Sequence, residues 1–303
     1  MTVNESPRYN SPQAARQAVT GKLRVAAQSG SWPLPDLQRQ YAYDQLVERL
    51  YRRDDAWVIK GATALLARRV SVRHTTDIDV YRAGAIGTVE RLVREAVTSI
   101  EIAAQIGDWM TFELGPAMPI TAAGAQGARV RVSAFIGATV WAQFHIDLVA
   151  DGIVMTGTPE QVPPLTDDVI SSAERIPWNA YPLVDHVADK VCAILETHDG
   201  HASTRFKDLV DLVAISARGT VDAALQMRAL AKEAHRRNLT LPAAFDVPDR
   251  ALWQTGYRAE AKRTRGLNAA DLDAALTVLR PMLDPLLDGT AIGVWDPSAA
   301  RWA

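Results

Sequence analysis

Three segments in the first half of the chain combine apolar, β-branched and aromatic residues in the manner of β-strands. They are "WMTFEL" (109–114), "ARVRVSAFIG" (128–137) and "WAQFHIDLVA" (141–150). Such residues fit a pleated surface, and their alternation gives each strand one apolar face and one polar face. The first half of the chain is therefore expected to contain a β-sheet, and the rest of the fold has to be compatible with it.

Shorter elements precede these strands. Ser11 suits the cap of a helix and Pro12 its first turn. The other expected elements are a helix over 36–53, strands over 57–60 and 77–81, and helices over 61–69 and 86–105. The segment "GIVMTG" (152–157) is a candidate for one more strand. Helices and strands thus mix along this part of the chain.

After the proline-containing loop "PEQVPPLTDD" (159–168), strand patterns nearly vanish. Helices are expected over about 184–197, 203–217, 220–238, 256–264 and 270–285. A length of 303 residues is compatible with two domains. We therefore predict an α+β protein, with a mixed sheet-and-helix domain over 1–160 and a mostly helical domain over 161–303.

Composition narrows the class of protein. Hydrophobic residues make up 48% and charged residues 22% of the chain, as in ordinary soluble proteins. The single cysteine, Cys192, excludes an internal disulfide framework and favours a reducing compartment. The chain has no apolar run of about 18 residues, so a membrane span is not expected, and no secretory signal is apparent. The expected location is the cytoplasm, without a membrane partner.

Two carboxylates interrupt the strand over 77–81. In "TDIDV", Asp77 and Asp79 share one face while Ile78 and Val80 point to the other. The carboxylates lie about 7 Å apart along the strand, on a rigid element. Such a pair suits Mg²⁺, which takes one or two carboxylates and keeps room for water and phosphate oxygens. The alternative is a strand with one face in water.

The strand over 141–150 repeats this pattern, because His145 and Asp147 share its polar face. If the two strands are neighbours, three carboxylates converge, as two-metal phosphoryl transfer requires. In that case Asp147 is a third ligand or a general base. The alternative is an edge strand whose polar face is solvated.

A phosphate-binding junction is expected just upstream. In "VIKGATALLARR", a strand ending at Lys60 is followed by Gly61 and a helix whose first turn holds Thr63. A helix N-terminus offers free N–H groups and a positive dipole end to an anion. The segment is not a Walker A loop, since GxxxxGK[ST] is absent. A plain turn is the alternative.

Cations and further acids accompany these motifs. Arg73 precedes the aspartate pair, and Lys190 lies in the first helix of the second half. The segment "RFKDLVDLVAI" places Asp208 and Asp211 on one side of a helix. A lysine beside a triphosphate would neutralise charge as the leaving group departs, although a solvated helix lysine is the commoner case.

The order of these motifs resembles that of the AbiEii/AbiGii-type nucleotidyltransferase toxins. The matching segments are "KGATALLARR", "TTDIDV", "HIDLVA", "DK" and "RFKDLVDL", within about 57–216. The resemblance implies a bacterial toxin with a cognate antitoxin, distantly related to the DNA polymerase β-type transferases. It implies Mg²⁺-dependent transfer of a nucleoside monophosphate from an NTP, in some members to the 3′ end of a tRNA.

Carried over by position, the resemblance puts Gly61 at the triphosphate and makes Asp77 and Asp79 the metal ligands. It gives Lys190 a phosphate contact, and it assigns Asp211, with Asp208, to the functional set. Two departures stand out. Ala62 replaces a second glycine, and Thr75 and Thr76 stand where the family often has serine. Thr76 is a candidate nucleotide contact, or one of these threonines is a modification site.

An RNA surface is the last expectation. Residues 205–265 hold 12 Lys and Arg against 7 Asp and Glu, although the whole chain carries a net charge of −2. A basic stripe attracts nucleic-acid phosphates irrespective of sequence, and Arg236, Arg237, Lys262 and Arg263 are its candidate contacts. Solvated helix faces are the alternative. The rival functions are nucleotidyl transfer to a small molecule, and a catalytically silent protein that binds RNA or a partner.

Overall fold

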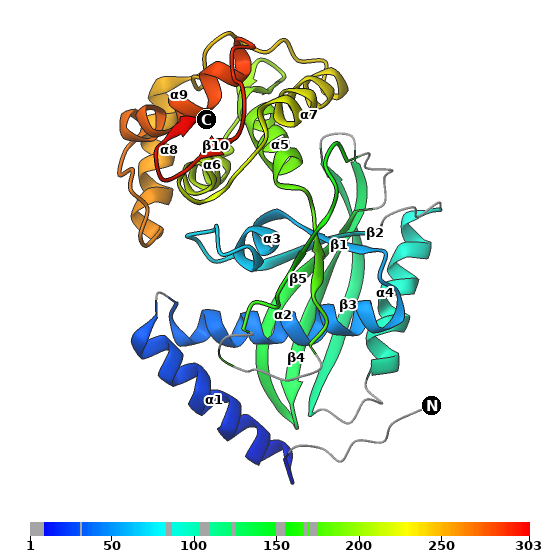
Figure 1. The fold of residues 1–303 in the computed structure, drawn as a ribbon. Coiled ribbons are helices and arrows are strands. Elements are labelled where there is room, and N and C mark those ends of the chain that lie inside the picture. The colour runs from blue at the N-terminus through cyan, green and yellow to red at the C-terminus, as the bar shows by residue number, and fades with distance from the viewer. Residues whose placement is uncertain are drawn as a thin grey trace. The chain divides into compact units, whose positions relative to one another are not determined.

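The computed structural model describes residues 9–30, 32–82, 87–103, 109–122, 125–149, 155–166, 169 and 175–303. The chain forms two compact units, drawn in Figure 1. The sheet unit comprises Met1–Ala67, Thr75–Ile153 and Glu160–Ala180, and the helical unit comprises Arg68–His74, Val154–Pro159 and Tyr181–Ala303. The predicted α+β class is confirmed, with strands concentrated in the first unit.

A seven-stranded mixed sheet forms the centre of the sheet unit, in the order β3-β4-β5-β2-β1-β7-β6. The strands are β1 (Trp57–Lys60), β2 (Asp77–Arg82), β3 (Met110–Ala122), β4 (Ala125–Ile136), β5 (Thr139–Val149), β6 (Glu160–Val162) and β7 (Trp178–Ala180). β2 runs parallel to β5 and antiparallel to β1, while β3, β4 and β5 form an antiparallel meander. The strands expected over 57–60, 77–81, 109–114, 128–137 and 141–150 are present, and β3 continues past the expected end to Ala122.

The boundary between the units differs from the predicted division at residue 160. Residues 160–180 belong to the sheet unit, because β7 pairs in parallel with β1 and β6 pairs with β7. Each of these two strands has three residues, too few for a periodic pattern to reveal. Of the candidate strand at 152–157, residues 152–154 lie outside the described residues, and the remainder is not a strand.

Four helices of the sheet unit match their predicted positions: α1 (Pro12–Ser29), α2 (Leu34–Arg53), α3 (Gly61–Ala67) and α4 (Val89–Ala103). Ser11 caps α1 as expected, since its hydroxyl accepts a hydrogen bond from the Ala14 N–H at 3.1 Å. α2 and α4 both pack against β5, and α4 also contacts β3 and β4. These helices therefore cover one face of the sheet.

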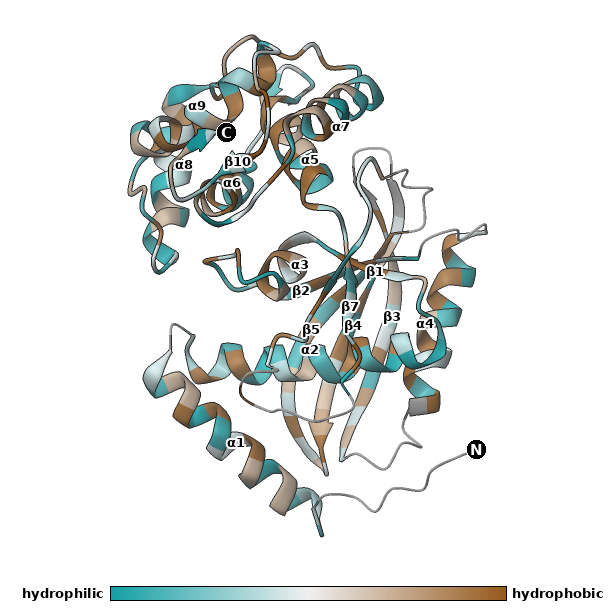
Figure 2. Cartoon of the chain, viewed as in Figure 1, coloured by the Kyte–Doolittle hydropathy of each residue, from teal (hydrophilic) through white to brown (hydrophobic). Residues whose placement is uncertain are grey.

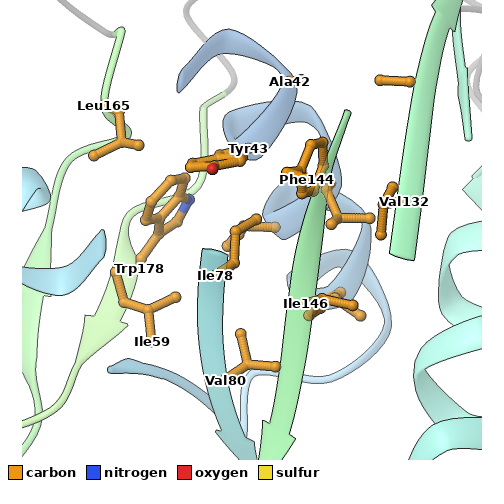
Figure 3. Packing of buried hydrophobic residues seen from close by; sticks show 14 of the residues in the cluster. Ala42, Tyr43, Ile59, Ile78, Val80, Val132, Phe144, Ile146, Leu165 and Trp178 are labelled. Carbon is orange, nitrogen blue, oxygen red and sulfur yellow. The ribbon is translucent and has the colours of Figure 1, made fainter. Parts of the chain in front are cut away.

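That covered face holds the core. Ile78 and Val80 of β2 and Ile146 of β5 are buried and pack beneath α2, as Figure 3 shows. Tyr43 of α2 meets Phe144 edge-to-face, with ring centroids 4.8 Å apart. Along β4 and β5, apolar residues alternate with polar ones, which can be followed by colour in Figure 2. The opposite face of the sheet therefore carries the polar side chains.

The helical unit contains α5 (Leu183–Leu195), α6 (Phe206–Arg218), α7 (Ala223–Arg236), α8 (Arg250–Arg263) and α9 (Leu272–Leu287). Two short hairpins accompany them, β8 (Thr197–His198) with β9 (His201–Ala202), and β10 (Trp295–Asp296) with β11 (Arg301–Trp302). α8 begins earlier than predicted, because the Asp249 side chain caps its first turn. Burial raises the pKa of Cys192 to about 12, as expected for an inert thiol.

No helix in the described part of the chain is long and apolar enough to cross a membrane.

A buried acid holds the sheet unit together. The Asp44 carboxylate of α2 accepts hydrogen bonds from the backbone N–H groups of Leu165, at 2.7 Å, and Thr166, at 2.9 Å. It also pairs with Arg175 Nη1 at 2.9 Å, and both side chains are almost fully buried. Asp44 therefore fixes the segment that leads towards β7 against α2.

Replacing Asp44 by alanine should lower the free energy of unfolding by about 3–5 kcal/mol, because Arg175 would be left buried without its charge partner. The matched control is Glu48→Ala on the same helix, which breaks an exposed pair with Arg52 and should cost about 1 kcal/mol or less. Urea denaturation followed by circular dichroism measures both. Equal losses in the two variants would contradict the assigned role.

Candidate active site

The register of β2 and β5 brings the expected acidic residues together. Asp77 lies opposite His145 and Asp79 lies opposite Asp147 in the parallel pair. The Asp77 side chain retains 34% exposure, whereas Ile78, next to it on the strand, is fully buried. Both expectations, the shared face of the aspartates and the neighbouring β5, are therefore confirmed. We call this side of the sheet the carboxylate face.

Two rows of side chains cross the carboxylate face from strand to strand. The first row is Arg131 of β4, His145 of β5 and Asp77 of β2. The second row is Arg129 of β4, Asp147 of β5, Asp79 of β2 and Lys60 of β1. Cations at the ends of the second row flank two acids in its centre, so the register itself distributes charge across the face.

Asp147 is not free to join the other carboxylates. Arg129 binds it with two parallel hydrogen bonds, Nε to Oδ1 at 2.8 Å and Nη2 to Oδ2 at 2.6 Å. Only 10% of the Asp147 side chain is exposed. Across the described residues, no three His, Cys, Asp or Glu side chains are gathered so that they could hold a metal ion. The three carboxylates therefore lie on adjacent positions of one face, but Arg129 engages the third of them.

Hydroxyl groups hold the backbone of Asp77. Thr63 Oγ1 and Thr75 Oγ1 each donate to the Asp77 carbonyl oxygen at 3.1 Å. The Tyr43 hydroxyl donates to the Thr75 carbonyl oxygen at 3.0 Å. Burial raises the pKa of Tyr43 far above its ordinary value, so this hydroxyl keeps its proton and remains a donor. These contacts fix the start of β2, where the first carboxylate stands.

This arrangement changes the interpretation of the threonines. Thr63 was expected at the phosphates, yet its side chain is fully buried and its hydroxyl is used by the backbone of Asp77. Thr75 has the same anchoring role. Thr76 is exposed, with Oγ1 3.5 Å from Asp77 Oδ2, and it stays a candidate for contact with a ligand.

Gly61 is required by the position of Asp79. Its φ of +57° lies in the left-handed region, which side chains with a Cβ rarely adopt. A Cβ at this position would also overlap the Asp79 carboxylate. The predicted strand–glycine–helix junction is therefore present, and the group that approaches Gly61 in this structure is the Asp79 side chain.

In the helical unit, four predicted site residues form one ion network. Lys190 Nζ lies 2.8 Å from Asp208 Oδ1 and 2.7 Å from Asp211 Oδ2. Arg73 binds Asp211 with two hydrogen bonds of 2.7 Å, and Arg205 Nε lies 2.5 Å from Asp208 Oδ2. Positive and negative groups alternate from Arg73 to Arg205, so each acid has two cationic partners.

The central side chains of this network are almost fully buried. The Lys190 side chain is 8% exposed, whereas that of Arg205 at the outer end is 61% exposed. Burial alone would lower the pKa of Lys190, but the charges of Asp208 and Asp211 outweigh it and raise that pKa. Burial likewise opposes the charge on Asp208, and Lys190 outweighs it and lowers the pKa of that carboxyl. Lys190 and Asp208 are therefore both charged and compensate each other.

The expected basic stripe is divided. Arg237 on the segment after α7 is 9% exposed and pairs with Glu196 at 2.6 Å and Glu233 at 2.5 Å. Arg236 also binds Glu233, although half of its side chain is exposed. Lys262 and Arg263 at the end of α8 are exposed. Only the α8 part of the stripe thus presents both of its cations to solvent.

Sequence reasoning missed Arg129 and Tyr43. The signal for Arg129 was its alternation with Val130 in "ARVRV", which places it on the same face as the acids once the strands are paired. No pattern in the sequence pointed to Tyr43, because its bond to the Thr75 carbonyl joins segments 32 residues apart.

Residues 45–278 match the family described as Nucleotidyl transferase AbiEii toxin, Type IV TA system. The match covers most of the chain, and the protein therefore belongs to this family of nucleotidyltransferase toxins. The expected enzyme class is confirmed by it. No match was found among curated proteins.

Several solved structures are similar in fold. MenT4, a nucleotidyltransferase toxin from Mycobacterium tuberculosis H37Rv, shares 18% identity, with 88% of this chain and 99% of that chain covered and a TM-score of 0.48. JHP933 from Helicobacter pylori shares 17% identity, with 84% and 94% covered and a TM-score of 0.47. The family membership rests on the match over residues 45–278.

Replacing Gly61 by alanine should reduce nucleotide transfer about a hundredfold, because the new Cβ displaces the Asp79 carboxylate. The left-handed backbone should add a stability loss of about 1–2 kcal/mol. Incorporation of labelled nucleotide and thermal unfolding measure the two effects. Gly21→Ala in α1 is the control, since its Cβ would meet open space. Full activity of Gly61→Ala would refute the close approach.

Replacing Lys190 by alanine should lower the free energy of unfolding by about 3–5 kcal/mol, because Asp208 and Asp211 would remain buried with one cation fewer. The control is Lys207→Ala, an exposed lysine on α6, which should change stability by about 0.5 kcal/mol or less. Urea denaturation measures both. An unchanged stability of Lys190→Ala together with a raised KM for NTP would instead favour a phosphate contact.

Proposed function

We propose that this protein is an Mg²⁺-dependent nucleotidyltransferase toxin that transfers a nucleoside monophosphate from an NTP to RNA, at the 3′ end of tRNA. The observation that carries the proposal is the Asp77–Asp79 pair, which stands on a rigid central strand with its neighbours Ile78 and Val80 in the core. Blocked tRNA would then stop translation, and a cognate antitoxin in the cytoplasm would counteract it.

The carboxylate face fits the proposed metal. Asp77 and Asp79 supply oxygen ligands from one face of one strand, and Mg²⁺ takes one or two carboxylates together with water and phosphate oxygens. Bound there, the ion would neutralise the charge of the triphosphate. Asp147 contributes through Arg129 rather than as an exposed ligand, since both of its oxygens are engaged.

In the proposed reaction, the hydroxyl oxygen of the acceptor attacks the α-phosphorus of the NTP. A new phosphodiester bond forms, the bond from the α-phosphorus to the oxygen that bridges to the β-phosphate breaks, and pyrophosphate leaves. The proton of the attacking hydroxyl passes to water. Lys60 and Gly61 lie beside Asp79 and are the proposed neighbours of the triphosphate. The Lys190–Asp208–Asp211 network stabilises the helical unit. Arg205 at its outer end is exposed and is the member of the network that is accessible to a phosphate group.

For the RNA, Lys262 and Arg263 on α8 are the better-supported contacts, because they are exposed while Arg237 is buried in ion pairs. The burial of Arg237, in contrast, makes the basic stripe smaller than expected. This favours a second candidate function, transfer to a small-molecule acceptor, which needs no basic stripe. Incubation of the protein with each labelled NTP and total RNA, followed by gel electrophoresis, distinguishes them. Label on RNA supports the proposal, and its absence contradicts it.

Asp77→Asn and Asp79→Asn should each abolish nucleotide incorporation while the melting temperature changes little. Each removes a charge from the carboxylate face and leaves the core residues in place. The control is Glu101→Gln, an exposed acid on α4. Labelling of RNA by either aspartate variant at a rate close to that of the wild type would refute the assignment of the site.

A further inference from the structure

The carboxylate face continues past Asp77 along β4 and β5. Away from the aspartates, the next positions on this face are Arg131 with His145 and then Ser133 with Gln143. Phe135 with Val140 follows beyond a register shift between Ala134 and Phe135. The core residues alternate with them on the other side, where α2 and α4 pack. We call the surface formed by these three pairs the track. Same-face residues along a strand are about 7 Å apart, so the track with the adjacent row of Arg129 and Asp147 extends for about 20 Å.

The side chains nearest the carboxylates are polar and accessible. Arg131 and Gln143 are exposed, and 42% of the His145 side chain is exposed. They form a chain of contacts in which Arg131 Nη2 donates to Gln143 Oε1 at 3.3 Å and Gln143 Nε2 donates to Ser133 Oγ at 3.1 Å. This chain orients the guanidinium and leaves its remaining N–H groups to face solvent.

Charge on the track is positive next to the aspartates. Asp147 balances Arg129 in the second row, whereas Arg131 lies opposite His145 in the first row. Glu113 of β3 is exposed opposite Ser133 and bounds the track on its outer side. A negative charge therefore borders the track on the β3 side.

The far end of the track is apolar. Phe135 is half-buried and does not belong to the core cluster, and Val140 beside it is 46% exposed. An aromatic ring on an open sheet face is a stacking platform for an unpaired base, whatever its sequence. A cationic side chain followed by an aromatic one is an arrangement typical of surfaces that bind single-stranded nucleic acid.

We propose that the single-stranded end of the acceptor RNA lies along this track, with its backbone phosphate at Arg131 and a base on Phe135. The inference rests on the proposed function and adds the path of its acceptor. Continuity with the aspartates carries it, because Asp77 and Arg131 belong to one row across three adjacent strands. The 3′ hydroxyl then reaches the carboxylates while the rest of the strand leads away along β4 and β5.

The test compares Arg131→Glu, Arg131→Lys and Phe135→Ala in the full chain. Binding of a short 5′-fluorescein single-stranded RNA is measured by anisotropy at several salt concentrations, and labelling of the same RNA gives KM for RNA and for NTP. Arg131→Glu should weaken RNA binding at least tenfold, with the NTP KM unchanged. It should also reduce the slope of log K against log salt concentration by about the contribution of one phosphate contact. Arg131→Lys should stay close to the wild type, and Phe135→Ala should weaken binding regardless of sequence.

The control is Arg94→Glu, an exposed charge reversal on α4, which packs on the covered side of the sheet. It should bind RNA as the wild type does. If the wild type labels RNA and Arg131→Glu does so with unchanged KM, the track is wrong and the proposed function stands. A raised NTP KM without a change in RNA binding would make Arg131 a triphosphate contact and also overturn the track. If the wild type labels no RNA, the proposed function itself fails.

Discussion

The parallel pairing of β2 with β5 is the constraint on which the site depends. It fixes Asp77 beside His145 and Asp79 beside Asp147, and it buries Ile78 between the same strands. A slip of one residue would turn both aspartates into the core, where an uncompensated charge is very costly. Burial of the apolar positions therefore selects which face carries the acids, so the hydrophobic core determines on which side of the sheet the charges lie.

Three carboxylates in adjacent positions would repel one another, and the sheet resolves this with an arginine. Arg129 is one strand away from Asp147 in the same row, and its two hydrogen bonds neutralise that carboxylate. The hydrogen bonds to Asp147 in turn raise the pKa of Arg129, so the guanidinium keeps its charge. The two acids of β2, Asp77 and Asp79, lie next to this pair on the same face of the sheet.

The sequence allowed much of this sheet to be predicted, because alternation is a local property. The strand over 77–81 and its shared acidic face followed from five residues, and the long strands β3 to β5 followed from composition. The partners of each acid did not follow, since they come from distant segments. Thr63 illustrates this: its position in a first helical turn suggested a phosphate contact, but tertiary packing directs its hydroxyl to Asp77. The three-residue strands β6 and β7 were missed because no periodicity can show in so few residues.

The helical unit shows why a sequence motif does not by itself assign a role. Lys190, Asp208 and Asp211 have the order that the family resemblance associates with catalysis, yet each is buried against the others. A buried lysine with two carboxylate partners cannot turn to a phosphate without leaving two buried acids with one cation fewer each, at a cost of several kcal/mol. Arg205 binds Asp208 at the outer end of the same network, and its side chain is largely exposed. Lys190 therefore holds Asp208 in the position from which that acid binds Arg205, and Arg205 is the member of the network that faces solvent.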